Sequence, residues 1–232
     1  MRLGWFTVLV LVVDSSTPAV TAALAEVSAG GVVLRAHRRT VDARAHGELL
    51  APQVDVVLAD CDARPADLGA IVAGLGPGPF TGLRVGLVTA ATMGQVLGVP
   101  TYGVCSLDGI GHPAAAGEPV LAASDARRRE IYWAVYDGAG QRIAGPEVSA
   151  PAVAAQRARD LAVTVAVGDG AHRYAETLGL PVRDEPRYPE AGVLAALAAE
   201  RIRAGAPGEA LTPLYLRRPD AVAATARKPV LP

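Results

Sequence analysis

One order of predicted elements occurs twice along the 232 residues and constrains the fold more than any other feature. An apolar strand ends at an aspartate, a second strand and a glycine turn follow, and a third strand leads into a helix. A further strand, a glycine-containing loop and another helix complete the unit. The first strand covers residues 8–13 and ends at Asp14 in the first copy, and covers 119–124 and ends at Asp125 in the second. Because no residue-level similarity accompanies the two copies, they repeat an architecture only.

The remaining elements follow from the same patterns. In the first copy we predict strands near residues 19–25, 32–37 and 68–73 and helices over 44–60 and 81–97. In the second copy we predict strands over 130–136, 142–148 and 163–167, a helix near 152–161 and another after residue 170. We predict that the side chains over 130–136 alternate between buried and exposed positions, as in a half-buried strand. Thr81 is a good N-cap for the helix over 81–97.

A three-strand meander followed by crossover helices is the plan of a ribonuclease-H-like lobe. Two such lobes in tandem are the plan of the actin, sugar-kinase and Hsp70 superfold, which hosts kinases, ATPases and proteins with no activity. The predicted fold class is therefore α/β, with an N-terminal lobe over residues 1–113 and a C-terminal lobe over 114–232. The late helix over 191–203 is expected to pack back on the N-terminal lobe.

Composition excludes several classes of protein. Twenty-two basic and 23 acidic residues give a net charge of −1, so the chain lacks the overall positive charge that would bind nucleic acid without a partner. Cys61 and Cys105 are too few for a disulfide framework or a zinc site. The apolar start resembles a short signal peptide, but it is too short to span a bilayer, which needs about 20 residues, and Asp14 interrupts it. We therefore expect a cytoplasmic protein without a membrane segment.

Catalytic equipment is scarce. In the superfold, an aspartate after the first strand of each lobe commonly handles magnesium and phosphates, which predicts a vestigial nucleotide cleft. The cleft would be lined by Asp14, Ser15, Ser16, Asp125 and Arg127. The alternative is that each aspartate caps the turn at its strand end. That alternative gains weight because the loop after Asp14 has neither a glycine nor a nearby lysine to receive a phosphate.

Other chemistry finds no better support. The glycine-rich loop over residues 74–82 is not a P-loop, and Pro77 and Pro79 lack the N–H groups that an anion needs, so a rigid turn is expected. The four histidines, His37, His46, His112 and His172, show no metal-ligand spacing, and His112 is expected in a loop. No nucleophile elbow G-x-S-x-G is present. We expect no catalytic residue, metal or cofactor.

The predicted helix over residues 81–97 carries small residues at every fourth position: Gly82, Gly86, Ala90 and Gly94. These positions share one face, which therefore has almost no side chains. Each interior glycine costs roughly 1 kcal/mol against alanine, so close packing should offset the loss. The packing element is either the helix over 44–60 or the sheet within this chain, or a helix of another chain. Both can coexist in a four-helix bundle.

The segment G-P-G-P-F-T-G-L-R-V-G-L at residues 76–87 resembles the signature G-P-G-S-F-T-G-[LIV]-R-[LIV]-G of the bacterial TsaB (YeaZ) family, with Pro79 in place of serine. Similarity to the family extends over nearly the whole chain. The other similar segments are D-S-S-T at 14–17, H-G-E-L-L at 46–50, D-A-R at 125–127, E-I-Y at 130–132, G-D-G at 168–170 and P-L-Y-L-R at 213–217.

This resemblance implies a non-catalytic scaffold subunit required for threonylcarbamoyl transfer to N6 of the adenosine beside the tRNA anticodon. The implied partners are a catalytic, metal-bearing TsaD-type paralogue, a TsaE-type ATPase, and a second copy of the chain when it is alone. The tRNA would be reached only through the complex. By resemblance, the N-terminal lobe carries the partner interface, formed by His46, Leu49, Leu50, Gly82, Arg84, Val85, Gly86 and Ala90.

Three other functions stay open. Relatives once labelled glycoproteases suggest a peptidase, and the two aspartates suggest a stand-alone nucleotide-binding protein. The basic runs Arg127-Arg128-Arg129 and Arg217-Arg218 suggest a direct RNA reader. Because no exposed aromatic residues are interleaved with these runs, a solvated surface is favoured over RNA binding.

Overall fold

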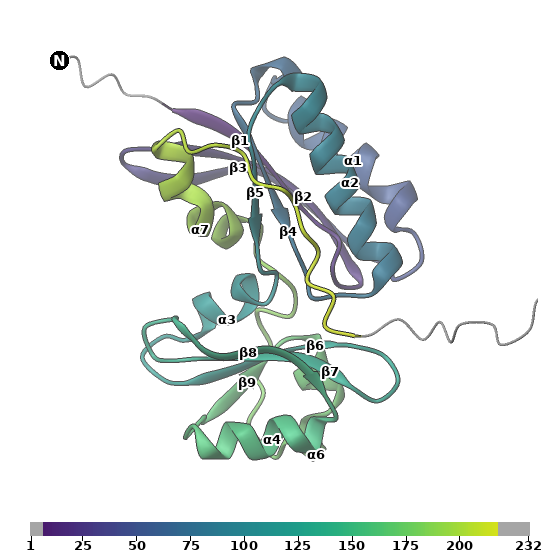
Figure 1. Cartoon of the computed structure of the whole chain (residues 1–232), viewed down its shortest axis with the longest axis vertical. Helices are drawn as coiled ribbons and strands as arrows, with labels where there is room; N and C mark the ends of the chain where they lie inside the picture. The colour runs from purple at the N-terminus through teal and green to yellow at the C-terminus, as the bar shows by residue number, and fades with distance from the viewer. Residues whose placement is uncertain (1–6, 218–232) are drawn as a thin grey trace, which may run out of the picture.

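The computed structural model describes residues 7–217, which form two α/β lobes stacked along the long axis of the molecule (Figure 1). The first lobe is built on a five-stranded sheet in the order β3-β2-β1-β4-β5. Its strands are β1 (Val8–Asp14), β2 (Ala19–Ser28), β3 (Gly31–Val41), β4 (Ala70–Gly74) and β5 (Thr101–Val104). The first three strands form an antiparallel meander, and β4 and β5 add to it in parallel. This is the predicted ribonuclease-H-like plan.

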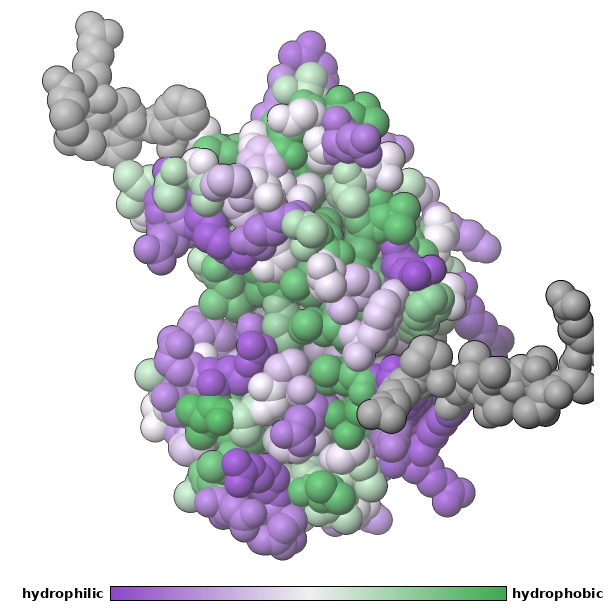
Figure 2. Space-filling model, viewed as in Figure 1, coloured by the Kyte–Doolittle hydropathy of each residue, from purple (hydrophilic) through white to green (hydrophobic). Residues whose placement is uncertain are grey.

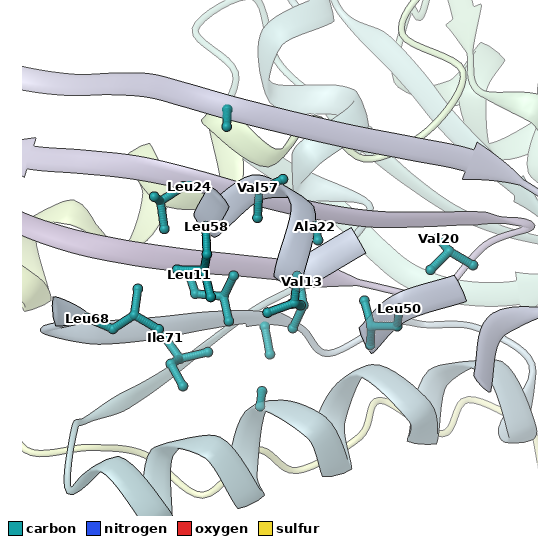
Figure 3. Packing of buried hydrophobic residues seen from close by; sticks show 14 of the residues in the cluster. Leu11, Val13, Val20, Ala22, Leu24, Leu50, Val57, Leu58, Leu68 and Ile71 are labelled. Carbon is teal, nitrogen blue, oxygen red and sulfur yellow. The ribbon is translucent and has the colours of Figure 1, made fainter. Parts of the chain in front are cut away.

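Helices cover both faces of the first sheet. Helices α1 (His46–Ala59) and α2 (Phe80–Leu97) lie side by side on one face, and α7 (Ala191–Arg203) lies on the other (Figure 1). Successive residues of β1 point to opposite faces, so Leu11 and Val13 join the cluster under α1 and α2 while Val10 and Val12 pack under α7. Figure 3 shows the first of these clusters, in which the buried side chains of α1 meet those of β1 and β2. The return of α7 brings the end of the chain back to the first lobe.

The second lobe repeats the plan with four strands. The sheet order is β8-β7-β6-β9, and β9 runs parallel to β6. Its strands are β6 (Val120–Asp125), β7 (Ile131–Tyr136), β8 (Arg142–Ser149) and β9 (Val165–Val167). Helix α3 (Asp108–Ala114) packs on the face toward the first lobe (Figure 1). The opposite face carries α4 (Pro151–Asp160) and α6 (Ala175–Leu178), and α5 (Asp169–Arg173) follows β9. Two ribonuclease-H-like lobes in tandem confirm the predicted fold class.

Three local predictions were wrong. All six residues of β7 are buried, because one side packs toward α3 and the other toward α4. Thr81 is not an N-cap: α2 begins at Phe80, after Pro79 in an extended conformation. His112 lies within α3 rather than in a loop. Strand β5 and helix α3 were not predicted, because both are short and contain glycine.

A C-terminal strap over residues 204–217 leaves α7, follows β5 and reaches the second lobe (Figure 1). The Glu209 amide donates to the Thr101 carbonyl oxygen at 2.7 Å, and the Leu214 amide donates to that of Leu75 at 2.8 Å. Leu214 and Leu216 then pack against the core of the second lobe. The strap is therefore the third connection between the two lobes, after those that follow β5 and precede α7. Among the helices of residues 7–217, none combines the length and apolarity needed to cross a membrane.

The small-residue side of α2 packs against its own lobe. Gly86 donates its amide to Ser15 Oγ at 2.8 Å, and the same hydroxyl donates to the Gly82 carbonyl oxygen at 2.7 Å. A Cβ atom added at Gly86 would lie 2.6 Å from Ser15 Oγ, and one added at Gly94 would lie 2.5 Å from the Thr101 side chain. The close packing that offsets the low helix propensity of these glycines is therefore against the β1–β2 turn and against β5.

We predict that Gly86→Ala lowers the free energy of unfolding by about 1–3 kcal/mol, because the new methyl group overpacks the Ser15 contact. Gly192, near the start of α7, has open space around its Cα and is the matched control. Gly192→Ala should be neutral or stabilising by up to about 1 kcal/mol. Chemical denaturation of both variants measures the difference. Equal stability of the two variants would contradict the close packing of Gly86 against Ser15.

Candidate partner-binding face and interlobe cleft

The carboxylate of Asp14 at the end of β1 is fully used inside the first lobe. Its Oδ1 accepts hydrogen bonds from the amide of Ser16 at 2.9 Å and from Ser16 Oγ at 2.8 Å. Its Oδ2 accepts from Ser106 Oγ at 2.6 Å. Burial raises the pKa of Asp14, and the hydrogen bonds from Ser106 and Ser16 oppose that rise. Asp14 therefore caps its turn and ties β1 to the segment after β5.

The space beside this turn is filled by the glycine-proline loop before α2. A Cβ atom at Gly78 would lie 2.1 Å from the carbonyl oxygen of Ser16, so only glycine allows the two backbones to approach so closely. The hydroxyl of Ser15 is occupied by Gly82 and Gly86. Asp14, Ser15 and Ser16, which the sequence predicted to line a nucleotide cleft, therefore contact protein in this structure.

The second lobe has an aspartate after each of its two parallel strands, β6 and β9. Asp125 at the end of β6 accepts a hydrogen bond from the amide of Arg127 at 3.2 Å. The guanidinium groups of Arg127 and Arg173 approach its carboxylate at 4.0 and 3.9 Å. Asp169 follows β9, and burial, followed by the nearby Asp125 carboxylate, raises its pKa to about 6. Within the described residues, Asp169 Oδ1 is buried without a hydrogen-bond partner.

A cavity of about 170 Å³ lies where the two lobes meet. Residues of both lobes line it: Thr17, Pro18, Ala43, His46, Pro79, Phe80, Thr81, Gly82, Asp125 and Arg127. Small-molecule sites usually enclose about 300–1,000 Å³, so the cavity is small for a nucleotide. Residues 7–217 contain no group of three or more His, Cys, Asp or Glu side chains that could hold a metal ion.

The outer side of α1 and α2 exposes large apolar side chains. Phe80, Val88 and Val96 of α2 are 55%, 61% and 78% exposed, and Val56 of α1 is 42% exposed. Arg84 is the one charged residue of α2. Figure 2 shows hydrophobic surface on the α2 side of the upper lobe. We call these five residues the docking face, because several exposed large apolar side chains on one side of a molecule are typical of protein–protein interaction sites.

The predicted interface residues divide into two groups. Arg84 is exposed, and Leu49, Val85 and His46 are half-buried, with His46 Nε2 2.8 Å from the Thr17 carbonyl oxygen. The other four are covered by their own lobe: Leu50, Gly82, Gly86 and Ala90. The sequence allowed the small-residue side of α2 to pack within this chain or against another chain. The structure shows packing within this chain. The surface that α2 offers to another molecule is therefore its opposite side.

The sequence did not predict the contacts of Tyr215. Its ring stacks on Phe80 with centroids 5.3 Å apart, and its hydroxyl accepts a hydrogen bond from Arg84 Nε at 3.0 Å. The Arg84 guanidinium also lies 4.1 Å from the centre of the Phe80 ring. Tyr215 is 131 positions from Arg84, so only its place in the family-like segment P-L-Y-L-R could have marked it. The strap thus holds two side chains of the docking face.

The turn between β6 and β7 has an unusual backbone. Arg127, Arg128 and Arg129 have φ angles of 62°, 53° and 62°, in the left-handed region. Left-handed conformation costs a non-glycine residue roughly 1–2 kcal/mol. The turn is closed by hydrogen bonds from the Ala126 amide to the Glu130 carbonyl oxygen at 3.0 Å and from the Glu130 amide to that of Arg127 at 2.9 Å. The turn contains neither Gly nor Asn, and this is the feature of the sequence that could have indicated the strained backbone.

Two ribonuclease-H-like lobes facing each other across a cleft place the chain in the actin, sugar-kinase and Hsp70 superfold. The model of the TsaD family, tRNA N6-adenosine threonylcarbamoyltransferase, matches residues 28–187, more than half of the chain. The chain belongs to this family.

Individual relatives agree with the family and with the resemblance to TsaB (YeaZ). An uncharacterized protein of Mycobacterium tuberculosis is 47% identical over 212 residues, covering 91% of this chain and 93% of that protein. The Bacillus subtilis tRNA threonylcarbamoyladenosine biosynthesis protein TsaB is 36% identical over 95 residues, 39% of this chain and 40% of that protein. The structure of YeaZ from Pseudomonas aeruginosa superposes with a TM-score of 0.71 at 27% identity, covering 90% of this chain and 100% of that chain.

We predict that Asp169→Asn stabilises the protein at pH 7 by about 1–2 kcal/mol. The pKa of Asp169 is about 6 in the folded chain and about 3.9 when unfolded, so the folded state binds the proton more tightly. Stability therefore falls as pH rises from about 4 to about 6, and the amide removes that loss.

Chemical denaturation at pH 4, 5, 6 and 7 measures this effect, with the exposed Asp55→Asn of α1 as the control for the amide substitution. The gain of Asp169→Asn should vanish at pH 4, where the wild-type carboxyl is protonated in the folded state and the pKa difference no longer costs stability. A gain of the same size at pH 4 and pH 7 would show that the stabilisation does not come from the charge.

Proposed function

We propose that this protein is the non-catalytic scaffold subunit of a threonylcarbamoyltransferase acting on N6 of the adenosine beside the tRNA anticodon. Family membership and the similarity to TsaB proteins support the pathway. The observation that carries the scaffold role is the docking face, which exposes Phe80, Val88 and Val96 beside a single charge on α2. A helix of 18 residues with this outer side is suited to burial against another protein.

The partner that we propose is the TsaD-type catalytic paralogue. A paralogue of the same fold would present its own pair of helices, and two pairs would form a four-helix bundle. Leu49 and Val85, each half-buried, would flank this contact. The same surface would pair two copies of the chain when the paralogue is absent. A TsaE-type ATPase would bind the assembled pair in the cytoplasm, and the tRNA would be reached through the complex.

The contacts of the polar residues support a non-catalytic role. His46, His112 and His172 each direct one ring nitrogen to a backbone carbonyl oxygen, and no histidine of residues 7–217 forms a hydrogen bond with the hydroxyl or thiol that it would have to activate. Burial raises the pKa of the Cys105 thiol to about 11, which disfavours the thiolate. These contacts disfavour the glycoprotease-like peptidase. The filled region beside Asp14 disfavours the stand-alone nucleotide-binding protein.

We predict that Val88→Glu weakens binding to the host's TsaD homologue at least tenfold while leaving the fold intact. The substitution places a carboxylate in the centre of the docking face, where burial against an apolar partner would remove its water. Val153→Glu on α4 is the matched control, because Val153 is also an exposed helical valine, 56% exposed. Co-purification and a binding titration measure the effect, with circular dichroism confirming the fold.

Three outcomes separate the functions. Binding by the wild type and by Val153→Glu, but not by Val88→Glu, supports the scaffold role and its surface. Equal binding by all three would move the interface elsewhere on the chain. Absence of binding by the wild type, together with ATP or peptide hydrolysis by the isolated chain, would replace the scaffold role with one of the two alternatives.

A further inference from the structure

The arginine turn, formed by Arg127, Arg128 and Arg129, lies on the same side of the molecule as the docking face. Figure 1 places the β6–β7 turn at the end of the second sheet that lies below α1 and α2. Phe80 of the docking face and Arg127 line the same cavity. The ion pair between Glu130 and Arg217 also brings the end of the strap to this turn. A partner bound at the docking face would therefore lie beside the turn.

The backbone of the turn keeps three arginine side chains at the surface. Left-handed positions in hairpin turns are usually occupied by Gly, Asn or Asp, which adopt them at little cost. Arginine has no such advantage, so the local sequence does not favour this conformation. Strained residues of this kind persist where the surrounding structure holds them, and they cluster at functional sites. Here β6 and β7, both fully buried, hold the two ends of the turn.

The charge around the turn is positive. Arg173 from α5 is 61% exposed, and its guanidinium faces Asp125 together with that of Arg127. Neither distance, 4.0 Å for Arg127 and 3.9 Å for Arg173, corresponds to a close hydrogen-bonded pair. Glu130 is engaged by Arg217. Two carboxylates, those of Asp125 and Asp169, therefore lie near the exposed Arg127 and Arg173, and Arg129 adds a third exposed arginine.

We propose that the arginine turn, together with Arg173, binds phosphodiester groups of the tRNA that the complex modifies. This inference rests on the proposed function, because the tRNA reaches the turn through the partner. Guanidinium groups bind phosphate oxygens through pairs of parallel hydrogen bonds, and a fixed turn presents several of them to neighbouring phosphates. The net charge of −1 for the whole chain limits RNA contact to this local cluster.

The test measures tRNA affinity of the complex between this chain and the host's TsaD homologue, by filter binding at several salt concentrations. The double variant Arg129→Glu, Arg173→Glu should weaken tRNA binding about tenfold or more and make the affinity less dependent on salt, because fewer counterions are released. The control is Arg157→Glu, Arg159→Glu on α4, which makes the same charge change on the far face of the second sheet. Arg129→Lys should retain most of the binding.

The outcomes also distinguish RNA from other ligands of the turn. Unchanged tRNA affinity of the double variant in an intact complex would overturn this inference alone. Loss of ATP or AMP binding with unchanged tRNA affinity would overturn it by assigning the arginines to a nucleotide phosphate, and loss of the complex would overturn it by assigning them to the partner. Failure of the wild type to bind the partner would overturn the proposed function as well.

Discussion

The hydrogen-bonded contact between the end of β1 and the start of α2 is the constraint on which the rest of the structure depends. The hydroxyl of Ser15 joins two backbone groups of α2, and the carboxylate of Asp14 joins the loop after β5 through Ser106. A buried carboxylate without such partners would be costly, and three hydrogen bonds satisfy it here. The contact fixes the rotation of α2 about its axis. Its glycines consequently face the sheet and its large apolar side chains face outward.

The same contact has a functional consequence. The side of the β1–β2 turn that the sequence predicted as part of a nucleotide cleft is used for internal packing. In the first lobe the glycine-proline loop occupies the side of the β1–β2 turn where a ligand would lie, as the approach of Gly78 to Ser16 shows. In the second lobe the loop before α5 also approaches the end of β6, since a Cβ atom at Gly170 would lie 2.8 Å from the carbonyl oxygen of Ser124, but Asp125 still lines the cavity between the lobes. The two lobes share a plan but differ in the turns after β1 and β6. The filling of the first lobe supports the proposed scaffold role.

The sequence predicted the fold well where apolar runs and turn residues agree. The doubled order of elements located β1, β6 and the helices α1, α2 and α4, and the alternation of β1 between two cores follows from its position inside the sheet. It could not show which side of α2 faces the sheet, since glycine at every fourth position suits either packing. It also could not show the stacking of Tyr215 on Phe80, which depends on the path of the strap. No aromatic residue neighbours the run Arg127-Arg128-Arg129 in the sequence, which disfavoured RNA binding. The fold nevertheless brings Phe80 to the cavity that Arg127 lines.

The strap connects these features, because it contacts both lobes and the docking face. Glu209 is held by Arg201 at 2.6 Å and pairs with β5 through its backbone, so the start of the strap is anchored on the first lobe. Tyr215 then contacts Arg84 and Phe80, and Arg217 contacts Glu130 beside the arginine turn. A change in the angle between the lobes would therefore move Tyr215 relative to α2 or break the pair with Glu130. The same 14 residues, 204–217, therefore hold Phe80 and Arg84 of the docking face and Glu130 beside the arginine turn in one arrangement, which fixes the proposed partner surface relative to the proposed RNA surface.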